Sequence, residues 1–441
     1  MPPSPSVAII GAGLAGTEAA LVLAGKGVRA DLFEMRPLRM TPAHTTGLPA
    51  ELVCSNSFKS QEVHSAHGVL KAELLELQSP LLLAARRSSV AAGSALAVDR
   101  KKFSAAAEAL LNAEPAIRFV RREMTAPPQG YAACIIAAGP LMSDALAQWL
   151  AQKLSVPSLN FYDAIAPIVS FDSVNTEVAF FGARYERESA DYLNCPFTGE
   201  EYRTFYDALR EADRISARAF EDERFFEACL PVEVLAEREY RALTFGPLKP
   251  IGLIDPRTGR RPVAVCQLRR ENEAGTAYNM VGFQTRLAIP EQRRVFRLIP
   301  GLEKAEFLRY GSIHRNTYCD SPRLLAPDLS LRAAPEIFIA GQLCGSEGYT
   351  ESIATGHLAA LFVRARLAGR PMCMPPRESA LGSLLQHVIF SPGIPFTPSN
   401  IHFGLFPALP DNARRMRKKA NREMLCERAL QSIAEWSTMV R

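Results

Sequence analysis

The sequence predicts an α/β fold into which a smaller α+β domain is inserted. A strand, a glycine-rich turn, a helix and a second strand open the chain, and α/β character returns near residue 336 after a middle section of different composition. The length of 441 residues exceeds an ordinary domain two- to threefold, so a second domain is expected. Apolar residues make up 48% and charged residues 22%, which excludes a mainly disordered, collagenous or disulfide-stapled chain.

The first element is a βαβ unit. An apolar strand over 7–10 leads into the motif GAGLAG at 11–16, then a helix over 17–25 and a strand over 28–33 that ends at Glu34. In this context Gly11 permits a tight turn, Gly13 lets the backbone approach a pyrophosphate and Gly16 allows close helix packing. The helix N-terminus offers N–H groups to phosphates, and Glu34 accepts hydrogen bonds from a ribose. The alternative is a glycine-rich turn without a ligand. The residues expected to bind a dinucleotide here are Gly11, Gly13, Leu14, Ala15, Gly16 and Glu34.

Two later strand-to-glycine junctions bear on the choice between FAD and NAD. A strand over 132–138 runs into Gly139, and a strand over 336–340 runs into Gly341 and Gln342, ahead of a helix over 352–367. Each junction alone can be an ordinary strand end. Three in this order favour FAD over a nicotinamide cofactor, because a two-part FAD site needs contacts at both the adenosine and the flavin. The further residues expected at the cofactor are Gly139, Gly341, Gln342, Glu347, Gly348 and Tyr349.

The remaining segments define the domain organisation. Residues 35–66 form a long polar loop that contains Cys54, and loops of this length in compact domains are usually functional or mobile. Beyond residue 191 the composition becomes aromatic and charged, with β-like stretches near 262–268 and 278–283. We expect residues 1–190 and 326–441 to form the cofactor-binding domain and residues 191–325 the insertion domain.

Charge and cysteine content restrict the class of protein further. The chain has no apolar run long enough to span a membrane and no signal-peptide pattern, so a cytoplasmic location is expected. The nine cysteines are an odd number without a CxxC pair or a Cys/His cluster, so reduced thiols are expected and no metal site. Of the net charge of +5, +4 lies in residues 411–441, which hold eight basic and four acidic residues.

Six segments resemble a known family. The stretches ELVCSNS (51–57), ALAVDR (95–100), FEACLP (226–231), FGPLKPIG (245–252), YNMVGFQ (278–284) and EGYTE (347–351) are similar to the folate- and FAD-dependent tRNA uracil-5-methyltransferases. The likeness covers nearly the whole chain. A sister family of flavin enzymes that modify the wobble uridine of tRNA shares the fold and the glycine motifs.

The resemblance implies an FAD-binding, Rossmann-like domain of the glutathione-reductase-like flavoprotein class with an insertion domain. It implies methylation of a uridine in the T loop of tRNA, with 5,10-methylenetetrahydrofolate as the carbon donor. Reduced FAD, regenerated by NAD(P)H, would supply the hydride. No obligate protein partner and no membrane association are expected. The alternatives are modification of another tRNA uridine and a non-catalytic RNA-binding flavoprotein.

The resemblance also assigns two cysteines to chemistry. Carbon 5 of uracil is a poor nucleophile until a thiolate adds to carbon 6, so a nucleophilic thiol and a proton acceptor are needed. Cys229 and Cys54 match the family's two functional cysteines. We expect Cys229 to be the nucleophile and Cys54 to assist in proton transfer or in guarding the flavin adduct; the reverse assignment stays open.

The basic run near the C-terminus is the candidate nucleic-acid surface. It contains no acidic residue and falls on an expected helix, where cations can lie along phosphates. A solvated helix face is the alternative. The residues expected to contact tRNA are Arg414, Arg415, Lys418 and Lys419.

Overall fold

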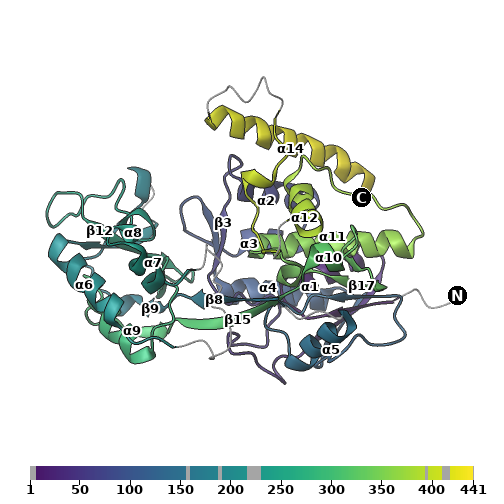
Figure 1. The fold of residues 1–441 in the computed structure, drawn as a ribbon, viewed down its shortest axis with the longest axis horizontal. Helices are drawn as coiled ribbons and strands as arrows, with labels where there is room; N and C mark the ends of the chain where they lie inside the picture. Colours follow the sequence, from purple (N-terminus) through teal and green to yellow (C-terminus); the bar gives the residue numbers. More distant parts are fainter. Residues whose placement is uncertain are drawn as a thin grey trace.

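A computed structural model describes residues 6–154, 159–186, 191–215, 230–392, 396–409 and 418–440. Figure 1 shows a larger domain that carries both termini and a smaller insertion domain built from the middle of the chain. Among the helices that the structure describes, none is long and apolar enough to cross a membrane.

The larger domain is built on a six-stranded sheet that is parallel except at one edge. Its central strands are apolar and buried, as expected for a sheet covered on both faces. The βαβ unit predicted at the N-terminus is present, since its two strands pair in parallel through the register Val7 to Ala30. The strand order is β16 (Ser330–Leu331), β17 (Ala334–Ile339), β7 (Ala133–Ile136), β1 (Ser6–Ile10), β2 (Arg29–Glu34) and β6 (Ile117–Arg121).

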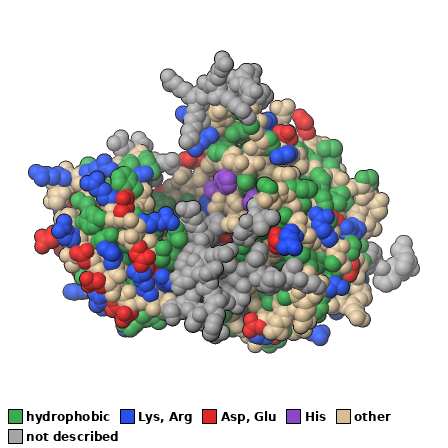
Figure 2. Space-filling view, in the orientation of Figure 1, with side chains coloured by type: hydrophobic (Ala, Val, Ile, Leu, Met, Phe, Trp, Pro, Cys, Tyr) green, Lys and Arg blue, Asp and Glu red, His purple; other side chains and the backbone are tan. Residues whose placement is uncertain are grey.

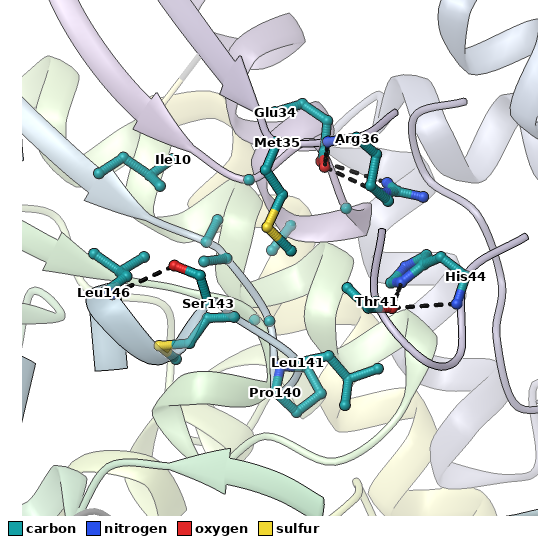
Figure 3. A pocket seen from close by; sticks show the side chains of 18 of the residues that line it. Ile10, Glu34, Met35, Arg36, Thr41, His44, Pro140, Leu141, Ser143 and Leu146 are labelled. Carbon is teal, nitrogen blue, oxygen red and sulfur yellow. Dashed lines mark hydrogen bonds and ion pairs between the residues drawn. The ribbon is translucent and has the colours of Figure 1, made fainter. Parts of the chain in front are cut away.

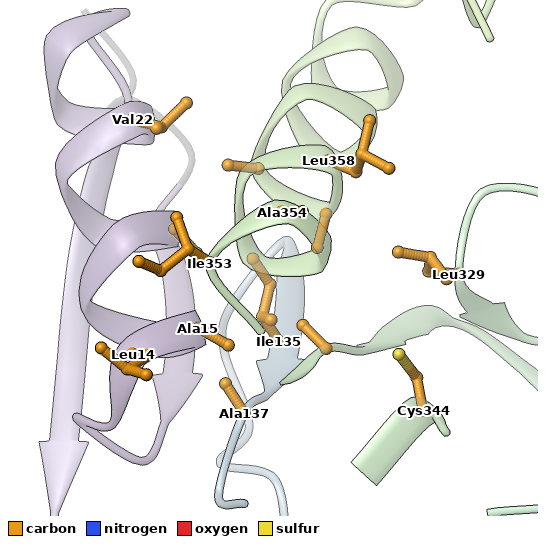
Figure 4. Close-up of a cluster of buried hydrophobic side chains, with 14 of the residues drawn as sticks. Leu14, Ala15, Val22, Ile135, Ala137, Leu329, Cys344, Ile353, Ala354 and Leu358 are labelled. Atoms are coloured by element: carbon orange, nitrogen blue, oxygen red, sulfur yellow. The ribbon is translucent and has the colours of Figure 1, made fainter. Parts of the chain in front are cut away.

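Two helices from opposite ends of the chain pack together over this sheet. These are α1 (Leu14–Gly25) and α11 (Tyr349–Leu367), which lie side by side in Figure 4. Gly356 makes the close approach possible, because a Cβ there would lie 2.3 Å from the carbonyl oxygen of Ala15. The other helices of this domain are α2 (Ala66–Glu76), α3 (Pro80–Arg87), α4 (Arg100–Ala113), α5 (Asp144–Leu154), α10 (Ser321–Leu324), α12 (Ala380–Phe390) and α14 (Lys418–Val440).

A small second sheet lies in the larger domain beside the long polar loop. It consists of β3 (Ser57–Ser60), β5 (Ala95–Val98) and β4 (Ser89–Val90), all paired antiparallel. Cys54 directly precedes this sheet in the chain, so the sheet fixes one end of the Cys54 segment.

The insertion domain is an antiparallel sheet with helices on one face. Alternate residues such as Leu193, Leu268 and Tyr278 pack into a buried core with the helices, and the opposite face is turned toward the larger domain. The sheet order is β10 (Phe180–Gly182), β11 (Tyr192–Phe197), β12 (Ala264–Arg270), β13 (Ala277–Met280), β9 (Ile168–Ser170) and β14 (Phe307–Arg309). The helices are α6 (Gly199–Glu211), α7 (Val232–Arg238), α8 (Ala242–Phe245) and α9 (Ile289–Phe296).

A two-stranded ribbon joins the domains. It pairs β8 (Leu159–Ile165) with β15 (Ser312–Tyr318) and runs between the two domains in Figure 1. Strands β9 and β10 belong to the insertion sheet although they precede residue 191. We therefore propose that the insertion domain begins near residue 166 and ends near residue 311. The composition change at 191 marks the insertion sheet's third strand in chain order, because the first two are short and lack a distinctive pattern.

Candidate functional site

The glycine turn between β1 and α1 is shaped by two tight contacts and one open position. Gly11 has a φ of +99°, and a Cβ on Gly16 would lie 1.9 Å from the carbonyl oxygen of Gly11. A Cβ on Gly13, in contrast, would meet no atom of the described chain within 4 Å. Gly11 and Gly16 are thus needed for the turn itself, whereas Gly13 leaves room for a ligand.

The open position lies at the start of α1. Gly13 is the N-cap residue and has no side chain to accept the first N–H groups of the helix. A helix N-terminus without a side-chain cap is suited to bind phosphate, which fits the pyrophosphate of a dinucleotide.

Glu34 holds this turn in place from the end of β2. Its Oε2 accepts a hydrogen bond from the N–H of Ala12 at 2.9 Å, and its Oε1 accepts from N and Nε of Arg36 at 2.9 and 3.0 Å. Burial alone would raise the pKa of Glu34, but the charge and hydrogen bonds of Arg36 lower it. An ionised acceptor therefore lies beside the glycine turn, where the predicted ribose contact requires it (Figure 3).

These elements surround a cleft that encloses about 980 Å³, part of it open to solvent. Its lining residues include Glu34 and Arg36, which Figure 3 labels, the glycine turn, and Tyr349 at the start of α11. Nine of the twelve residues predicted to contact the cofactor line it: Gly11, Gly13, Leu14, Ala15, Glu34, Gly139, Gly341, Gln342 and Tyr349.

The other three predicted residues support the cleft without lining it. Gly16 packs under the turn, as described above. Glu347 accepts a hydrogen bond from Nε2 of Gln342 at 2.6 Å, which orients a lining side chain. Gly348 is the N-cap of α11 with a φ of +118°, a conformation that L side chains rarely adopt.

Sequence reasoning missed most of the cleft that comes from loops. Thr41 and His44 lie at one end, joined by a contact of 2.6 Å between Oγ1 and Nδ1 (Figure 3). Residues such as Arg36, Val53 and Ser143 line it as well. The loop over 35–66 was expected to be functional or mobile. Apart from ELVCSNS at 51–57, it contains no motif that indicates which of its residues line the cleft.

The Cys54 segment lies next to the cleft and is held from several directions. The N–H groups of Cys54 and Ser55 both donate to the Tyr349 hydroxyl, at 2.9 and 3.1 Å. Arg100 donates to the carbonyls of Leu52 and Cys54, at 2.6 and 3.4 Å, and Arg309 donates to the carbonyl of Val53. Tyr349 thus connects the cofactor cleft directly to the backbone of Cys54, whose side chain is partly exposed.

Cys229, the other predicted catalytic residue, lies outside the described residues. The other described cysteines, apart from Cys373, are buried. Burial raises the pKa of Cys134 and Cys319 to about 12 and that of Cys344 and Cys426 to about 11, and also raises that of Cys195 and Cys266. Cys373 is partly exposed, far along the chain from either motif.

Two of the four predicted nucleic-acid residues, Lys418 and Lys419, lie at the start of α14. Arg414 and Arg415 fall outside the described residues, and of Lys418 only the backbone is described. The Lys419 side chain is 90% exposed, with its Nζ 4.0 Å from Glu423. The exposure of Lys419 leaves a contact of this residue with phosphate sterically possible.

The fold and the site define a dinucleotide-binding protein with an inserted domain. The family model described as "Glucose inhibited division protein A" matches residues 6–371. A solved structure of GidA from Aquifex aeolicus is similar at a TM-score of 0.70 with 15% identity, covering 99% of this chain and 74% of that one. This similarity confirms the predicted fold class.

Curated relatives define the family more closely. A protein of Oleidesulfovibrio alaskensis named methylenetetrahydrofolate--tRNA-(uracil-5-)-methyltransferase TrmFO is 49% identical over 439 residues, covering 99% of this chain and 98% of its own length. A protein of the same name from Anaeromyxobacter sp. is 51% identical over 435 residues, covering 98% of this chain and 96% of its own length. The chain belongs to this family of TrmFO methyltransferases, and the resemblance seen in the sequence is confirmed.

Proposed function

We propose that this chain is an FAD-dependent enzyme that transfers a one-carbon unit from 5,10-methylenetetrahydrofolate to carbon 5 of a uridine in tRNA, giving 5-methyluridine. The names of full-length relatives at 49% and 51% identity support the reaction. The structural observation that supports it most concerns Tyr349, a residue that lines the dinucleotide cleft and whose hydroxyl accepts hydrogen bonds from the N–H groups of Cys54 and Ser55. This contact supports a site in which a cofactor bound in the cleft would lie next to the Cys54 segment.

The described residues fit FAD. The open position at Gly13 and the uncapped start of α1 suit the pyrophosphate, and Glu34 suits the adenosine ribose. The far end of the cleft, near Gly341, Gln342 and Tyr349, remains for the flavin. When bound, FAD would relay the one-carbon unit and, reduced by NAD(P)H, supply the hydride that completes the methyl group.

The protein's own groups would activate the uracil. A thiolate that adds to carbon 6 makes carbon 5 nucleophilic, so that carbon 5 can form the new carbon–carbon bond. A base then removes the proton from carbon 5, and the thiolate leaves as the carbon 5–carbon 6 double bond returns. We assign the addition to Cys229 and the assisting role to Cys54, as the family motifs imply.

The substrate would bind across both domains. Figure 2 shows a hollow between the two domains with histidine side chains at its edge and Lys and Arg side chains spread over the insertion domain. A uridine in a folded T loop must leave its stack to reach a flavin, so a hollow between domains suits it. A tRNA substrate and cysteines that form no disulfide among the described residues are consistent with a cytoplasmic location of the protein.

The test is methyl transfer from labelled methylenetetrahydrofolate to tRNA transcripts, with NAD(P)H present. We expect label in a transcript that carries the T-loop uridine and none when that uridine is replaced by cytidine. Label lost on replacing the wobble uridine instead would indicate the sister activity. Absence of label from every transcript, with FAD bound and the protein folded, would leave a non-catalytic RNA-binding flavoprotein.

A further inference from the structure

The FGPLKPIG segment forms a loop on the insertion domain that is fixed through its backbone. This 245–252 loop begins at the last residue of α8, and its Leu248 side chain is buried in the insertion core. The carbonyl of Leu248 accepts a hydrogen bond from the N–H of Val265 at 2.9 Å, and the carbonyl of Ile251 accepts one from the N–H of Tyr185 at 3.3 Å. The loop therefore holds its outward side chains in defined places.

Aromatic side chains are exposed at both ends of the 245–252 loop. Phe245, its first residue, is 69% exposed, and Tyr185, which is bonded to Ile251 near the other end, is 59% exposed. Among the described residues, neither ring stacks on another aromatic ring. Large aromatic side chains are normally buried, so exposed rings on a fixed loop indicate a contact surface.

The segment around the loop carries an excess of positive charge. Residues 237–263 hold six basic and three acidic residues. Asp255 is paired with Arg257 inside the segment. Glu237 is paired with an arginine outside it, so Glu239 is the one acidic residue without an ion pair to a described group. The basic residues of the segment that make no ion pair with a described carboxylate are Arg241, Lys249, Arg260 and Arg261.

Two of these cations lie within one turn of Phe245 along the chain. The N–H of Phe245 donates to the carbonyl of Arg241 at 3.2 Å, and the N–H of Lys249 donates to the carbonyl of Gly246 at 3.4 Å. A third cation reaches the loop from β10, since Nη2 of Arg184 donates to a loop carbonyl at 2.6 Å. The buried Nε of Arg184 has no hydrogen-bond partner in the described part of the chain. Ring faces and unpaired positive charges therefore occur together at this loop.

The loop adjoins the segment that leads to Cys229. A Cβ on Gly282, in the YNMVGFQ motif, would lie 2.4 Å from the Cβ of Pro247, so this motif packs directly against the loop. The carbonyl of Gln284, at the end of the same motif, accepts a hydrogen bond from the N–H of Val232 at 2.7 Å. Val232 follows Cys229 by three positions in the sequence. Two of the family-like segments, and the start of the helix that follows a third, thus meet here.

We propose that the surface formed by Tyr185, Arg241, Phe245 and Lys249 binds unpaired nucleotides of the tRNA substrate. The rings stack on bases and the cations contact phosphates, which is how proteins hold single-stranded RNA. Unpaired positive charge favours a polyanion over an apolar protein surface, and a second copy of this chain would bring like charges together. The proposal rests on the proposed function and deepens it, because it places the RNA next to the segment that leads to the predicted nucleophile.

Tryptophan fluorescence measures the stacking directly, without folate or turnover. In FAD-bound Phe245→Trp, a tRNA transcript should quench the emission of the new indole, because a stacked base lies in direct contact with the ring. Phe181→Trp is the matched control, since Phe181 is 45% exposed in the same domain and its ring contacts Phe171. The unmutated enzyme, with its two tryptophans, gives the background.

Two further RNA probes separate stacking from attraction by charge alone. A hairpin with an unpaired loop should quench Phe245→Trp, and a fully paired duplex of equal length should not. Phe245→Leu, which keeps an apolar side chain and removes the ring, should weaken tRNA binding about tenfold.

The salt dependence of tRNA binding tests the cation. Lys249→Gln should reduce the slope of log affinity against log salt by about 0.7, as expected for one lost phosphate contact with a single strand. Lys304→Gln, which removes an exposed lysine elsewhere in the insertion domain, should leave the slope unchanged. Flavin absorbance checks that each variant is folded.

Five results would overturn the proposal. They are tRNA binding without quenching of Phe245→Trp, equal quenching in Phe245→Trp and Phe181→Trp, equal quenching by hairpin and duplex, unchanged tRNA affinity in Phe245→Leu, or equal salt slopes for Lys249→Gln and Lys304→Gln. Unchanged affinity would leave the surface to a protein partner. Quenching without methyl transfer would instead count against the proposed reaction alone, whereas absence of tRNA binding by the unmutated enzyme would overturn both.

Discussion

Nδ1 of His67 lies 3.4 Å from Oε1 of Glu351, a carboxylate that is 1% exposed in the first turn of α11. The same oxygen accepts a hydrogen bond from the N–H of Ile401 at 3.1 Å. Glu351 therefore connects three segments, α2, α11 and the chain after α12, close to the flavin end of the cleft.

This contact predicts a pH dependence of stability. Burial alone would raise the pKa of Glu351, but the hydrogen bond to His67 and the charge of Lys59 lower it from its ordinary value of 4.5 to about 2. The unfolded chain then binds more protons than the folded one between these pH values, so stability rises with pH across this window and is lost as pH falls through it. The contribution is about 3 kcal/mol, as expected for a shift of two to three pH units.

Glu351→Gln should flatten the acid limb of the stability curve. We expect the free energy of unfolding, measured by urea and circular dichroism from pH 2 to 6, to change less with pH in this variant. Glu62→Gln, which removes an exposed carboxylate near the start of α2, is the control and should keep the unmutated slope. Parallel curves for Glu351→Gln and the unmutated protein would show that Glu351 does not contribute.

The glycine turn predicts that cofactor binding and folding can be separated. Gly13→Val should preserve the circular dichroism and melting temperature and empty the cleft, because a Cβ at this position meets no described atom within 4 Å and projects where the pyrophosphate is expected. Gly16→Ala should also destabilise the fold, by about 1–3 kcal/mol, since its Cβ would overlap the Gly11 carbonyl.

Gly25→Ala provides the matched control at the other end of α1, where a Cβ meets no described atom within 4 Å. This variant should keep both flavin and stability. The measurements are flavin absorbance per polypeptide and thermal unfolding. Full flavin content in folded Gly13→Val would contradict the assignment of the pyrophosphate site.

The sequence predicted the parts of this site that depend on neighbours in the chain. The glycine turn and Glu34 were found because strand, turn, helix and strand follow one another within 29 residues, from Ser6 to Glu34. The environment of Cys54 could not be predicted in this way. Tyr349 and Arg309 approach it from 295 and 255 positions away, and no local pattern marks either as its neighbour.

Pairing between distant segments also explains the position of the domain boundary. Short strands such as β9 and β10, of three residues each, hold their place through pairing with longer strands. The residues of β9 and β10 show no clear alternation of apolar and polar side chains. The change in composition therefore indicated the inserted domain only from about β11 onward. Long-range pairing, and not local propensity, decides such elements.

The basic run that leads into α14 predicts a salt-dependent interaction with tRNA. Replacing Arg415, Lys418 and Lys419 together with Ala should weaken binding and reduce the slope of log affinity against log salt by about 0.7–0.9 for each phosphate interaction that is removed. Flavin content should stay normal. A matched control replaces three exposed arginines elsewhere on the larger domain, Arg118, Arg332 and Arg370, and should leave the slope unchanged. Equal slopes for the α14 variant and the unmutated enzyme would identify the run as a solvated helix face.

The division of labour between Cys229 and Cys54 can be tested with tRNA that carries 5-fluorouridine. Fluorine at carbon 5 cannot leave as a proton does, so the thiol that has added to carbon 6 stays bonded to the base. If Cys229 is the nucleophile, Cys229→Ala should abolish both the trapped adduct and methylation. Cys54→Ala should lose turnover and keep the adduct, since its assisting role follows the addition. Denaturing gels detect the adduct, and peptide mapping identifies the attached residue.

Cys373→Ala, which removes the partly exposed thiol outside the cleft, should retain both adduct and turnover. An adduct on Cys54 in Cys229→Ala at the unmutated rate would reverse the two roles. Absence of any adduct in the unmutated enzyme would exclude thiol addition as the way the ring is activated.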